Sequence, residues 1–234
     1  MGETYNRRLF SSGLRKYFHE ARFFWLKQQV SKFAPDASSV MELGCFDAKS
    51  IGYLPSLPDR YLGLDANVEG GLTLAKERWK EFDNYRFIEC KQPADIDLSG
   101  QVYDISICME TLEHLSDDAL DGYLNLLMNV TNTYVFITVP NETGLFFLFK
   151  HVLKRVVGSR SKSYKPSELV WATLGKTQKI QRRGHKGFNY RDLRRTLAKY
   201  FDILSVTGIP FRYLPASINF TIGFVATTRR TNRN

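Results

Sequence analysis

The chain has 234 residues, of which 43% are hydrophobic and 24% charged, a balance typical of a globular protein and not of a disordered one. It has no run of about 18 apolar residues, and its first residues lack the uninterrupted apolar stretch of a signal peptide, so we expect neither a membrane span nor a secretory leader. Its three cysteines, Cys45, Cys90 and Cys108, are too few for a disulfide framework and lack zinc-site spacing, which indicates free thiols in a reducing cytoplasm.

Strand-like and helix-like segments alternate through the first 143 residues. Residues 1–34 form an N-terminal segment that is expected to be helical from about Ser11 to Phe33. Within residues 35–143, strands are predicted at 39–43, 60–65, 84–89, 103–109 and 133–139, and helices at 49–54, 72–82 and 118–129. Because apolar strands that alternate with helices form βαβ units, this part predicts a parallel sheet covered on both faces.

The rest of the chain is predicted to be a cap insertion, residues 144–189, followed by a C-terminal unit, residues 190–234. In the cap, residues 144–158 fit an amphipathic helix, which favours either a lid over the site or a helix at a membrane interface. The apolar face would hold Leu145, Leu148, Phe149, Val152, Leu153, Val156 and Val157, and the polar face Lys150, His151, Lys154 and Arg155. The C-terminal unit is predicted to contain a helix at 190–200 and strands at 201–206 and 219–227.

Positive charge is concentrated in one part of the chain. The net charge is +9, and residues 150–199 hold 15 Lys and Arg against Glu168 and Asp192, a local excess of +13 that leaves −4 for the rest. This excess predicts a surface that meets something anionic, such as phosphate, lipid headgroups or nucleic acid. A solvated face that keeps the protein soluble explains the same charge equally well.

The turn after the first predicted strand suits a ligand-binding loop. Gly44 permits a tight turn and a close approach to a ligand, and the N–H groups that open the next helix can bind a carboxylate. Asp65 ends the second strand about 20 residues later, the spacing at which an acid binds ribose hydroxyls, although a helix N-cap is the alternative role. Glu42 lies within an apolar strand and needs a partner, which favours ligand binding over a structural ion pair.

Four blocks of sequence resemble the motifs of class I S-adenosylmethionine-dependent methyltransferases. They are residues 41–45, residues 61–65, residues 103–115 with their Leu-Glu-His ending, and residues 135–141. Their order and spacing fit from about residue 15 to the C-terminus, and the similarity is closest to the group that modifies small molecules, including quinones, sugars and lipids. The resemblance implies a single α/β domain with a Rossmann-like seven-stranded, mostly parallel sheet, helices on both faces, an antiparallel last strand, and S-adenosylmethionine as cofactor.

The resemblance also implies roles for individual residues. Glu42 and Gly44 would hold the amino-acid half of the cofactor, Asp65 the ribose, and residues 90–95 would flank the adenine. Met109 and Glu110 would lie beside the methionine part and the transferred methyl. The full set of implied cofactor residues is Glu42, Gly44, Cys45, Phe46, Asp65, Ala66, Cys90, Asp95, Met109 and Glu110.

In two places the chain departs from the motifs of these methyltransferases. Phe46 and Ala48 stand where the family usually has glycine. The usual acid after the third strand is replaced by Lys91 or a neighbouring residue, or is displaced to Asp95. A bulky Phe46 would narrow the cofactor loop.

The expected reaction is methyl transfer to a small-molecule acceptor, such as a sugar, a quinone or a lipid-linked hydroxyl. A hydroxyl acceptor is helped by a general base, for which His185 and His114 are the candidates; each has an idle structural role as its alternative. No His/Asp/Glu cluster has ligand spacing, so no metal is expected.

Other functions remain as alternatives to this reading. The chain is expected to be cytoplasmic, with peripheral membrane contact as an option, and a non-catalytic relative that binds the cofactor, nucleic acid or membrane is the alternative. A nicotinamide-dependent oxidoreductase is disfavoured because the first turn lacks GxGxxG, and nucleic acid is disfavoured because the chain has no RNP-type or KH-type motif.

Overall fold

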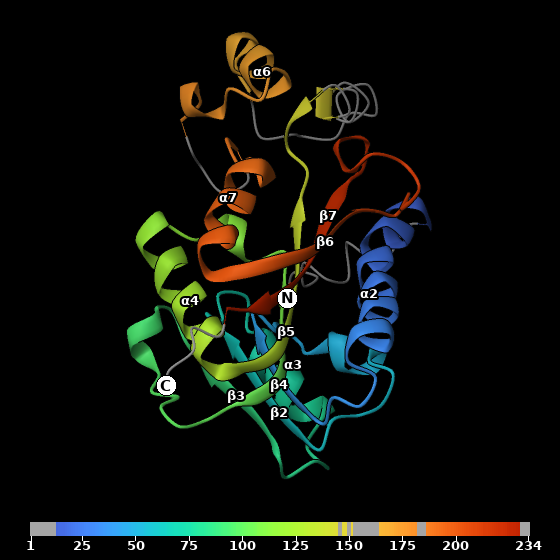
Figure 1. The fold of residues 1–234 in the computed structure, drawn as a ribbon, viewed down its shortest axis with the longest axis vertical. Helices are drawn as coiled ribbons and strands as arrows, with labels where there is room; N and C mark the ends of the chain where they lie inside the picture. The colour runs from blue at the N-terminus through green and yellow to red at the C-terminus, as the bar shows by residue number, and fades with distance from the viewer. Residues whose placement is uncertain (1–12, 145–146, 149–150, 152–163, 182–185, 230–234) are drawn as a thin grey trace.

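A single seven-stranded sheet forms the centre of the computed structural model, which describes residues 13–144, 147–148, 151, 164–181 and 186–229. The strand order is β3-β2-β1-β4-β5-β7-β6 (Figure 1). β7 runs antiparallel to both its neighbours, and the other four pairings are parallel, which confirms the predicted sheet with its antiparallel last strand. The strands are β1 (Ser39–Leu43), β2 (Arg60–Asp65), β3 (Tyr85–Glu89), β4 (Tyr103–Met109), β5 (Thr131–Pro140), β6 (Phe201–Ile209) and β7 (Thr221–Thr228).

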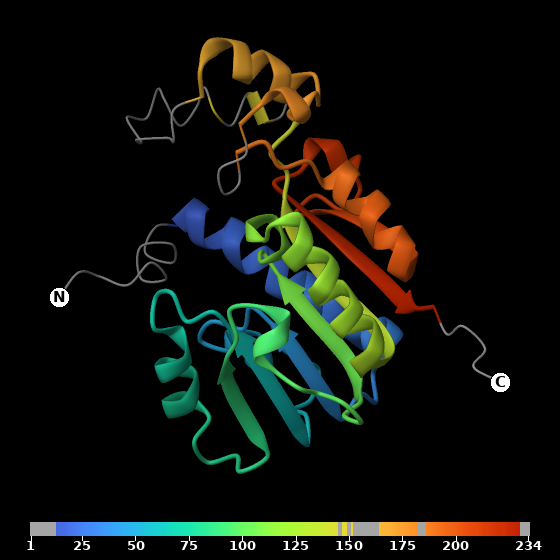
Figure 2. The same cartoon turned by 90° about the vertical axis from the view of Figure 1, so that its left-hand side faces the viewer.

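Helices cover both faces of this sheet (Figures 1 and 2). α4 and α7 pack on one face, while α2, α3 and the 3-10 helix η1 pack on the other. Within the described residues, the α-helices are α2 (Gly13–Phe33), α3 (Gly71–Arg78), α4 (Asp117–Val130), α6 (Pro166–Thr173) and α7 (Tyr190–Tyr200). The 3-10 helices are η1 (Lys49–Tyr53), η2 (Pro93–Asp95), η3 (Leu112–His114), η4 (Thr177–Lys179) and η5 (Ala216–Ile218).

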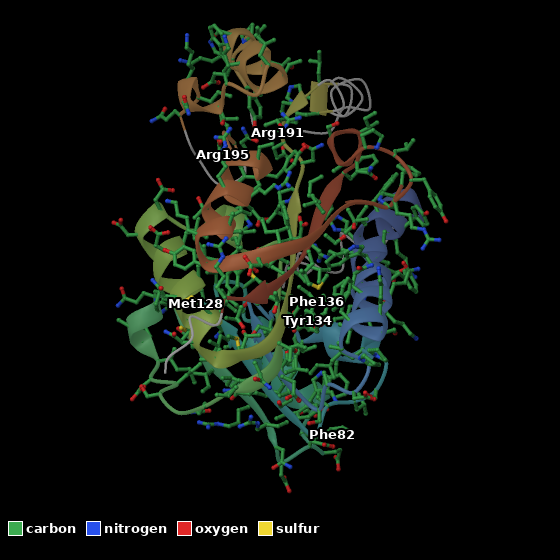
Figure 3. The ribbon with its side chains drawn as sticks, in the orientation of Figure 1. Phe82, Met128, Tyr134, Phe136, Arg191 and Arg195 are labelled. Carbon is green, nitrogen blue, oxygen red and sulfur yellow. The ribbon has the colours of Figure 1, made fainter. Side chains whose placement is uncertain are left out.

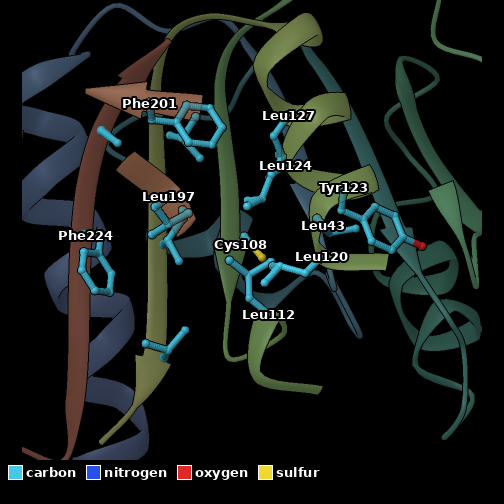
Figure 4. Packing of buried hydrophobic residues seen from close by; sticks show 14 of the residues in the cluster. Leu43, Cys108, Leu112, Leu120, Tyr123, Leu124, Leu127, Leu197, Phe201 and Phe224 are labelled. Atoms are coloured by element: carbon cyan, nitrogen blue, oxygen red, sulfur yellow. The ribbon is translucent and has the colours of Figure 1, made fainter. Parts of the chain in front are cut away.

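Two hydrophobic cores follow from the alternation of side chains along the strands. In β5, Val135, Ile137 and Val139 face the α4–α7 side, whereas Phe136 faces α2. Figure 4 shows the first core, in which Leu124 and Leu127 of α4 meet residues of β6, β7 and α7. Burying each such leucine contributes about 1.5–3 kcal/mol to the stability of the fold. Together the two cores hold the sheet, and with it the ends of its strands, in place.

Two predicted helices differ from the observed ones. The helix expected at 49–54 is the 3-10 helix η1, because Ala48 before it is left-handed and Leu54 after it is extended, as a residue before proline tends to be. The helix expected at 72–82 is α3, which ends at Arg78. Trp79 leaves the helical conformation there and its indole N–H donates to the carbonyl of Ala48 at 3.2 Å.

The cap forms a small cluster of its own around Phe147, Ala172 and Ile180. Most of the predicted amphipathic helix at 144–158 lies outside the described residues. The placement of His151 on a polar face is wrong, because its side chain is buried and its ring lies 6.0 Å from that of Phe147 and 5.6 Å from that of Tyr164. None of the described helices is both long and apolar enough to cross a bilayer.

Candidate functional site

The site predicted from the sequence falls at the topological switch point of the sheet. The chain leaves β1 towards β2 and leaves β4 towards β5, so the loops after β1 and β4 diverge from a shared crevice. At this point the Thr111 hydroxyl lies within hydrogen-bond distance of the carbonyls of Leu43 (3.4 Å) and Met109 (3.1 Å) and can donate to either. A Cβ on Gly44 would lie 2.0 Å from the Thr111 Oγ1, so only glycine fits there.

Residues with left-handed backbone are concentrated at the carboxyl ends of the strands. Gly44, Phe46 and Ala48 have φ values of 76°, 47° and 51°, so the loop keeps a left-handed form at every second residue even where it lacks glycine. Among the described residues, the other non-glycine positions with positive φ are Asn67 after β2 and Glu110 after β4. Each such residue costs on the order of 1 kcal/mol, and strain of this kind gathers at functional sites.

Asp65 supports the loop after β1. Its Oδ2 accepts the N–H of Phe46 at 2.9 Å, and its Oδ1 accepts the N–H of Asn67 at 2.7 Å. Each carboxylate oxygen can accept a further hydrogen bond, so Asp65 keeps the capacity to bind a ligand hydroxyl. The alternative role as a helix cap does not hold, because the N-cap of α3 is Gly70. The Phe46 N–H is therefore used within the protein, by Asp65.

Glu42 finds its partners inside the protein. The residue is 3% exposed, and its carboxyl accepts hydrogen bonds from the hydroxyls of Ser50 and Tyr61. Burial raises the pKa of Glu42 from 4.5 to about 7, against the lowering effect of these two hydrogen bonds. The partners that we expected for Glu42 are therefore Ser50 and Tyr61 of the protein itself. Its neighbour Cys45 is also buried.

The segment after β3 lies beside Asp65. The N–H of Cys90 donates to the Asp65 carbonyl at 2.8 Å, and the Cys90 thiol is buried and contacts the carbonyl of Gln92 at 3.3 Å. Asp95 is exposed and accepts the N–H groups of Lys91 (2.8 Å) and Gln92 (3.0 Å), which lower its pKa. The carboxylate of Asp95 thus closes its own turn. Asp65 ends β2 and Ala66 follows it, and both are half-buried.

The loop after β4 carries the remaining predicted residues and one acid that sequence reasoning missed. Met109 is 7% exposed, and the N–H of Glu110 donates to the Thr138 carbonyl at 2.8 Å. Glu113 is only 1% exposed, and burial, followed by the charge of Glu110, raises its pKa well above the usual value. The Leu-Glu-His motif was the available signal for Glu113, but a sequence does not show that this carboxyl points inwards.

Two groups from other elements face the same acid. Arg22 on α2 attracts the Glu113 carboxylate, whereas Glu142 after β5 repels it. His114 keeps 49% of its side chain exposed, with its Nε2 3.8 Å from the Glu113 Oε1. His114 is thus placed at the carboxyl edge beside a buried acid, whereas the other predicted base, His185, lies outside the described residues.

Within the described residues, neither the cysteines nor a group of metal ligands forms a further site. Cys45, Cys90 and Cys108 are buried free thiols there. No group of three or more His, Cys, Asp or Glu side chains among these residues has the arrangement of a metal site.

Two surface hollows lie away from the carboxyl ends of the strands. One, of about 450 Å³, lies along α2 between Phe24 and Lys32, and another, of about 420 Å³, lies before β2 and β3, around Leu57 and Tyr85. Neither includes a predicted site residue. Topology is the better guide here, because ligands of open α/β sheets bind at the switch point.

The fold has clear counterparts among solved structures. Magnesium protoporphyrin IX methyltransferase from Synechocystis, with S-adenosylhomocysteine bound, is 16% identical, with a TM-score of 0.57 over 95% of this chain and 91% of that one. An N-methyltransferase from Bradyrhizobium japonicum with the same ligand is 11% identical, with a TM-score of 0.58 over 95% and 91%. An S-adenosylmethionine-dependent methyltransferase from Clostridium acetobutylicum is 12% identical, with a TM-score of 0.63 over 96% and 98%.

Comparisons of the sequence, in contrast, found no relative. No family model and no curated protein matches the chain. The structural comparison alone shows that the chain has the fold of class I S-adenosylmethionine-dependent methyltransferases.

Proposed function

We propose that this protein transfers a methyl group from S-adenosylmethionine to a small-molecule acceptor. The observation that carries the proposal is the left-handed loop at Gly44, Phe46 and Ala48, which Asp65 supports at the switch point. That loop lies in a seven-stranded sheet with an antiparallel β7, the fold of proteins solved with S-adenosylhomocysteine bound.

The residues at the strand ends suit the parts of this cofactor. Asp65 would offer oriented carboxylate oxygens to the ribose hydroxyls, and Cys90 with Asp95 would flank the adenine. Gly44 and Glu42 would lie on the amino-acid side, with Met109 and Glu110 beside the methionine part. When bound, the cofactor supplies an activated methyl on a sulfonium ion, so the protein mainly aligns the acceptor and excludes water.

The acceptor would approach over the loop after β4. His114 is half-exposed there, beside the buried Glu113, and an accessible imidazole at this place suits a base that takes a proton from an acceptor hydroxyl. Candidate acceptors are a sugar, a quinone or a lipid-linked hydroxyl. A screen of these classes with isotopically labelled cofactor identifies the acceptor, and the absence of transfer to any class would favour a cofactor-binding relative without activity.

Calorimetry with S-adenosylhomocysteine tests the cofactor site. Asp65→Ala should weaken binding by about 1–3 kcal/mol, the usual loss when hydrogen bonds to a charged group are removed. Asp104→Ala is the matched control, because the Asp104 carboxylate also accepts two backbone N–H groups, those of Ser38 and Ser39. These lie at the amino ends of β1 and β4, away from the candidate site. Absence of binding by the unmodified chain, or tighter binding of NAD, would contradict the proposal.

A further inference from the structure

The connection between β6 and β7, residues 210–220, exposes large apolar side chains. Phe211 is 42%, Tyr213 86%, Leu214 47% and Ile218 44% exposed. Single exposed apolar residues are ordinary, but four within eight positions form a patch. Such a patch indicates a surface that is covered by something else.

This connection is held in a defined shape. The side chain of Asn219 accepts the N–H of Phe211 (2.8 Å) and donates to the carbonyls of Phe211 and Pro215 (both 3.2 Å). The side-chain amide of Asn141, just after β5, donates to the carbonyls of Ser217 (3.0 Å) and Asn219 (2.9 Å). The apolar side chains are therefore presented by a braced loop, and that loop is fixed to the strand end beside the candidate site.

A second set of exposed apolar side chains lies at the same end of the molecule. α6 occupies that end together with the β6–β7 connection in both views (Figures 1 and 2). On and just after α6, Val170 is 54% and Leu174 60% exposed. The carboxyl end of β5 points the same way, because Pro140 pairs with Thr221 at the start of β7. The crevice and both apolar sets thus share one end.

Positive charge surrounds these apolar side chains. Lys176 and Lys179 are exposed after α6, with their ammonium groups 5.8 and 4.3 Å from the ring centre of Trp171. Arg212 lies within the β6–β7 connection, and Figure 3 shows Arg191 at the start of α7 on the side of the cap.

The acids of these elements are already paired with bases. Glu168 binds Lys186 at 2.7 Å, and Asp192 binds Arg195 at 2.7 Å. Because Lys176, Lys179, Arg191 and Arg212 come in addition to these two pairs, the described residues of these elements are net positive.

Exposed aliphatic and aromatic side chains ringed by lysine and arginine fit one partner chemistry. An anionic bilayer takes apolar side chains into the acyl boundary and binds cations at its headgroups. A nucleic acid would use the cations and the aromatic rings, but would gain little from Val170, Leu174 and Leu214.

We propose that this end of the protein docks on an anionic phospholipid membrane, with α6 and the β6–β7 connection at the interface. The crevice then opens towards the bilayer. If the proposed methyl transfer holds, on which this last step rests, the acceptor is one carried by the membrane.

Vesicle co-sedimentation tests the docking. The full chain should bind vesicles that contain phosphatidylglycerol and bind vesicles of phosphatidylcholine alone much less. Lys176→Ser with Lys179→Ser should weaken binding roughly 25-fold, because each cation near an anionic surface contributes about fivefold. Tyr213→Ser with Leu214→Ser should weaken it about tenfold or more, because apolar contact is lost.

Matched pairs outside α6 and the β6–β7 connection serve as controls. Leu57→Ser with Val102→Ser changes residues that are 50% and 48% exposed and that precede β2 and β4. Lys27→Ser with Lys32→Ser removes the same charge from the carboxyl-terminal half of α2. Both control pairs should bind vesicles as the unmodified chain does.

Three results would overturn the docking: no binding to phosphatidylglycerol vesicles, equal losses in the control pairs, or lysine-dependent binding to RNA without binding to vesicles. Calorimetry with S-adenosylhomocysteine on the same preparations separates the two proposals. Cofactor binding without vesicle binding removes only the docking, and vesicle binding without cofactor binding removes only the proposed methyl transfer.

Discussion

Glu42 should make the protein less stable as the pH rises towards neutrality. Burial raises its pKa from 4.5 to about 7 in the folded state. Between these values the folded chain holds a proton that the unfolded chain has lost, so the free energy of unfolding falls as the pH rises. At about 1.4 kcal/mol per pH unit, the difference corresponds to a loss of about 3 kcal/mol, complete above the folded pKa and absent below 4.5.

Urea unfolding followed by tryptophan fluorescence measures this loss between about pH 5 and pH 8. In Glu42→Gln the amide oxygen can still accept the hydroxyls of Ser50 and Tyr61 but does not ionise, so the part of the pH dependence that Glu42 contributes should disappear. Glu89→Gln is the control: Glu89 ends β3 on the surface, where a hydrogen bond from Lys91 lowers its pKa. That variant should keep the wild-type loss.

An equal loss in Glu42→Gln and wild type would refute the reasoning. The buried Glu113, whose pKa is raised as well, would then be the group that couples stability to pH.

Two further substitutions test the site. Gly71→Ala places a Cβ 2.5 Å from the ring of Phe46, so it should displace the loop after β1 and lower the affinity for S-adenosylhomocysteine. Gly52→Ala is the control, because a Cβ there meets nothing within 4 Å and should leave the affinity unchanged. Equal affinities of the two variants in calorimetry would argue against the loop as a cofactor contact. His114→Ala should lower turnover while cofactor affinity stays unchanged, as measured by labelled methyl transfer beside calorimetry, and unchanged turnover would remove His114 as the base.

Much of the sheet was predictable because its signals are local. The strands at 39–43, 60–65 and 103–109 are observed at the predicted residues, since short apolar runs bounded by polar or turn residues specify buried strands. The helix at 190–200 is likewise as predicted, with Asn189 as its N-cap. Boundaries shifted where a neighbour in space decided them, as at Trp79, whose bond to Ala48 lies at the end of α3.

The sequence by itself determined the βαβ order, the glycine turn at Gly44 and the acid at Asp65, because periodicity, turn chemistry and motif spacing are all carried by neighbours in the chain. Only the tertiary structure decided what each polar group contacts. It gave Glu42 its partners Ser50 and Tyr61, and it brought the buried Glu113 to within reach of Arg22 from a helix about ninety residues earlier. Burial and charge partners arise from contacts between distant segments, and these fix the pKa values and the chemistry of the site.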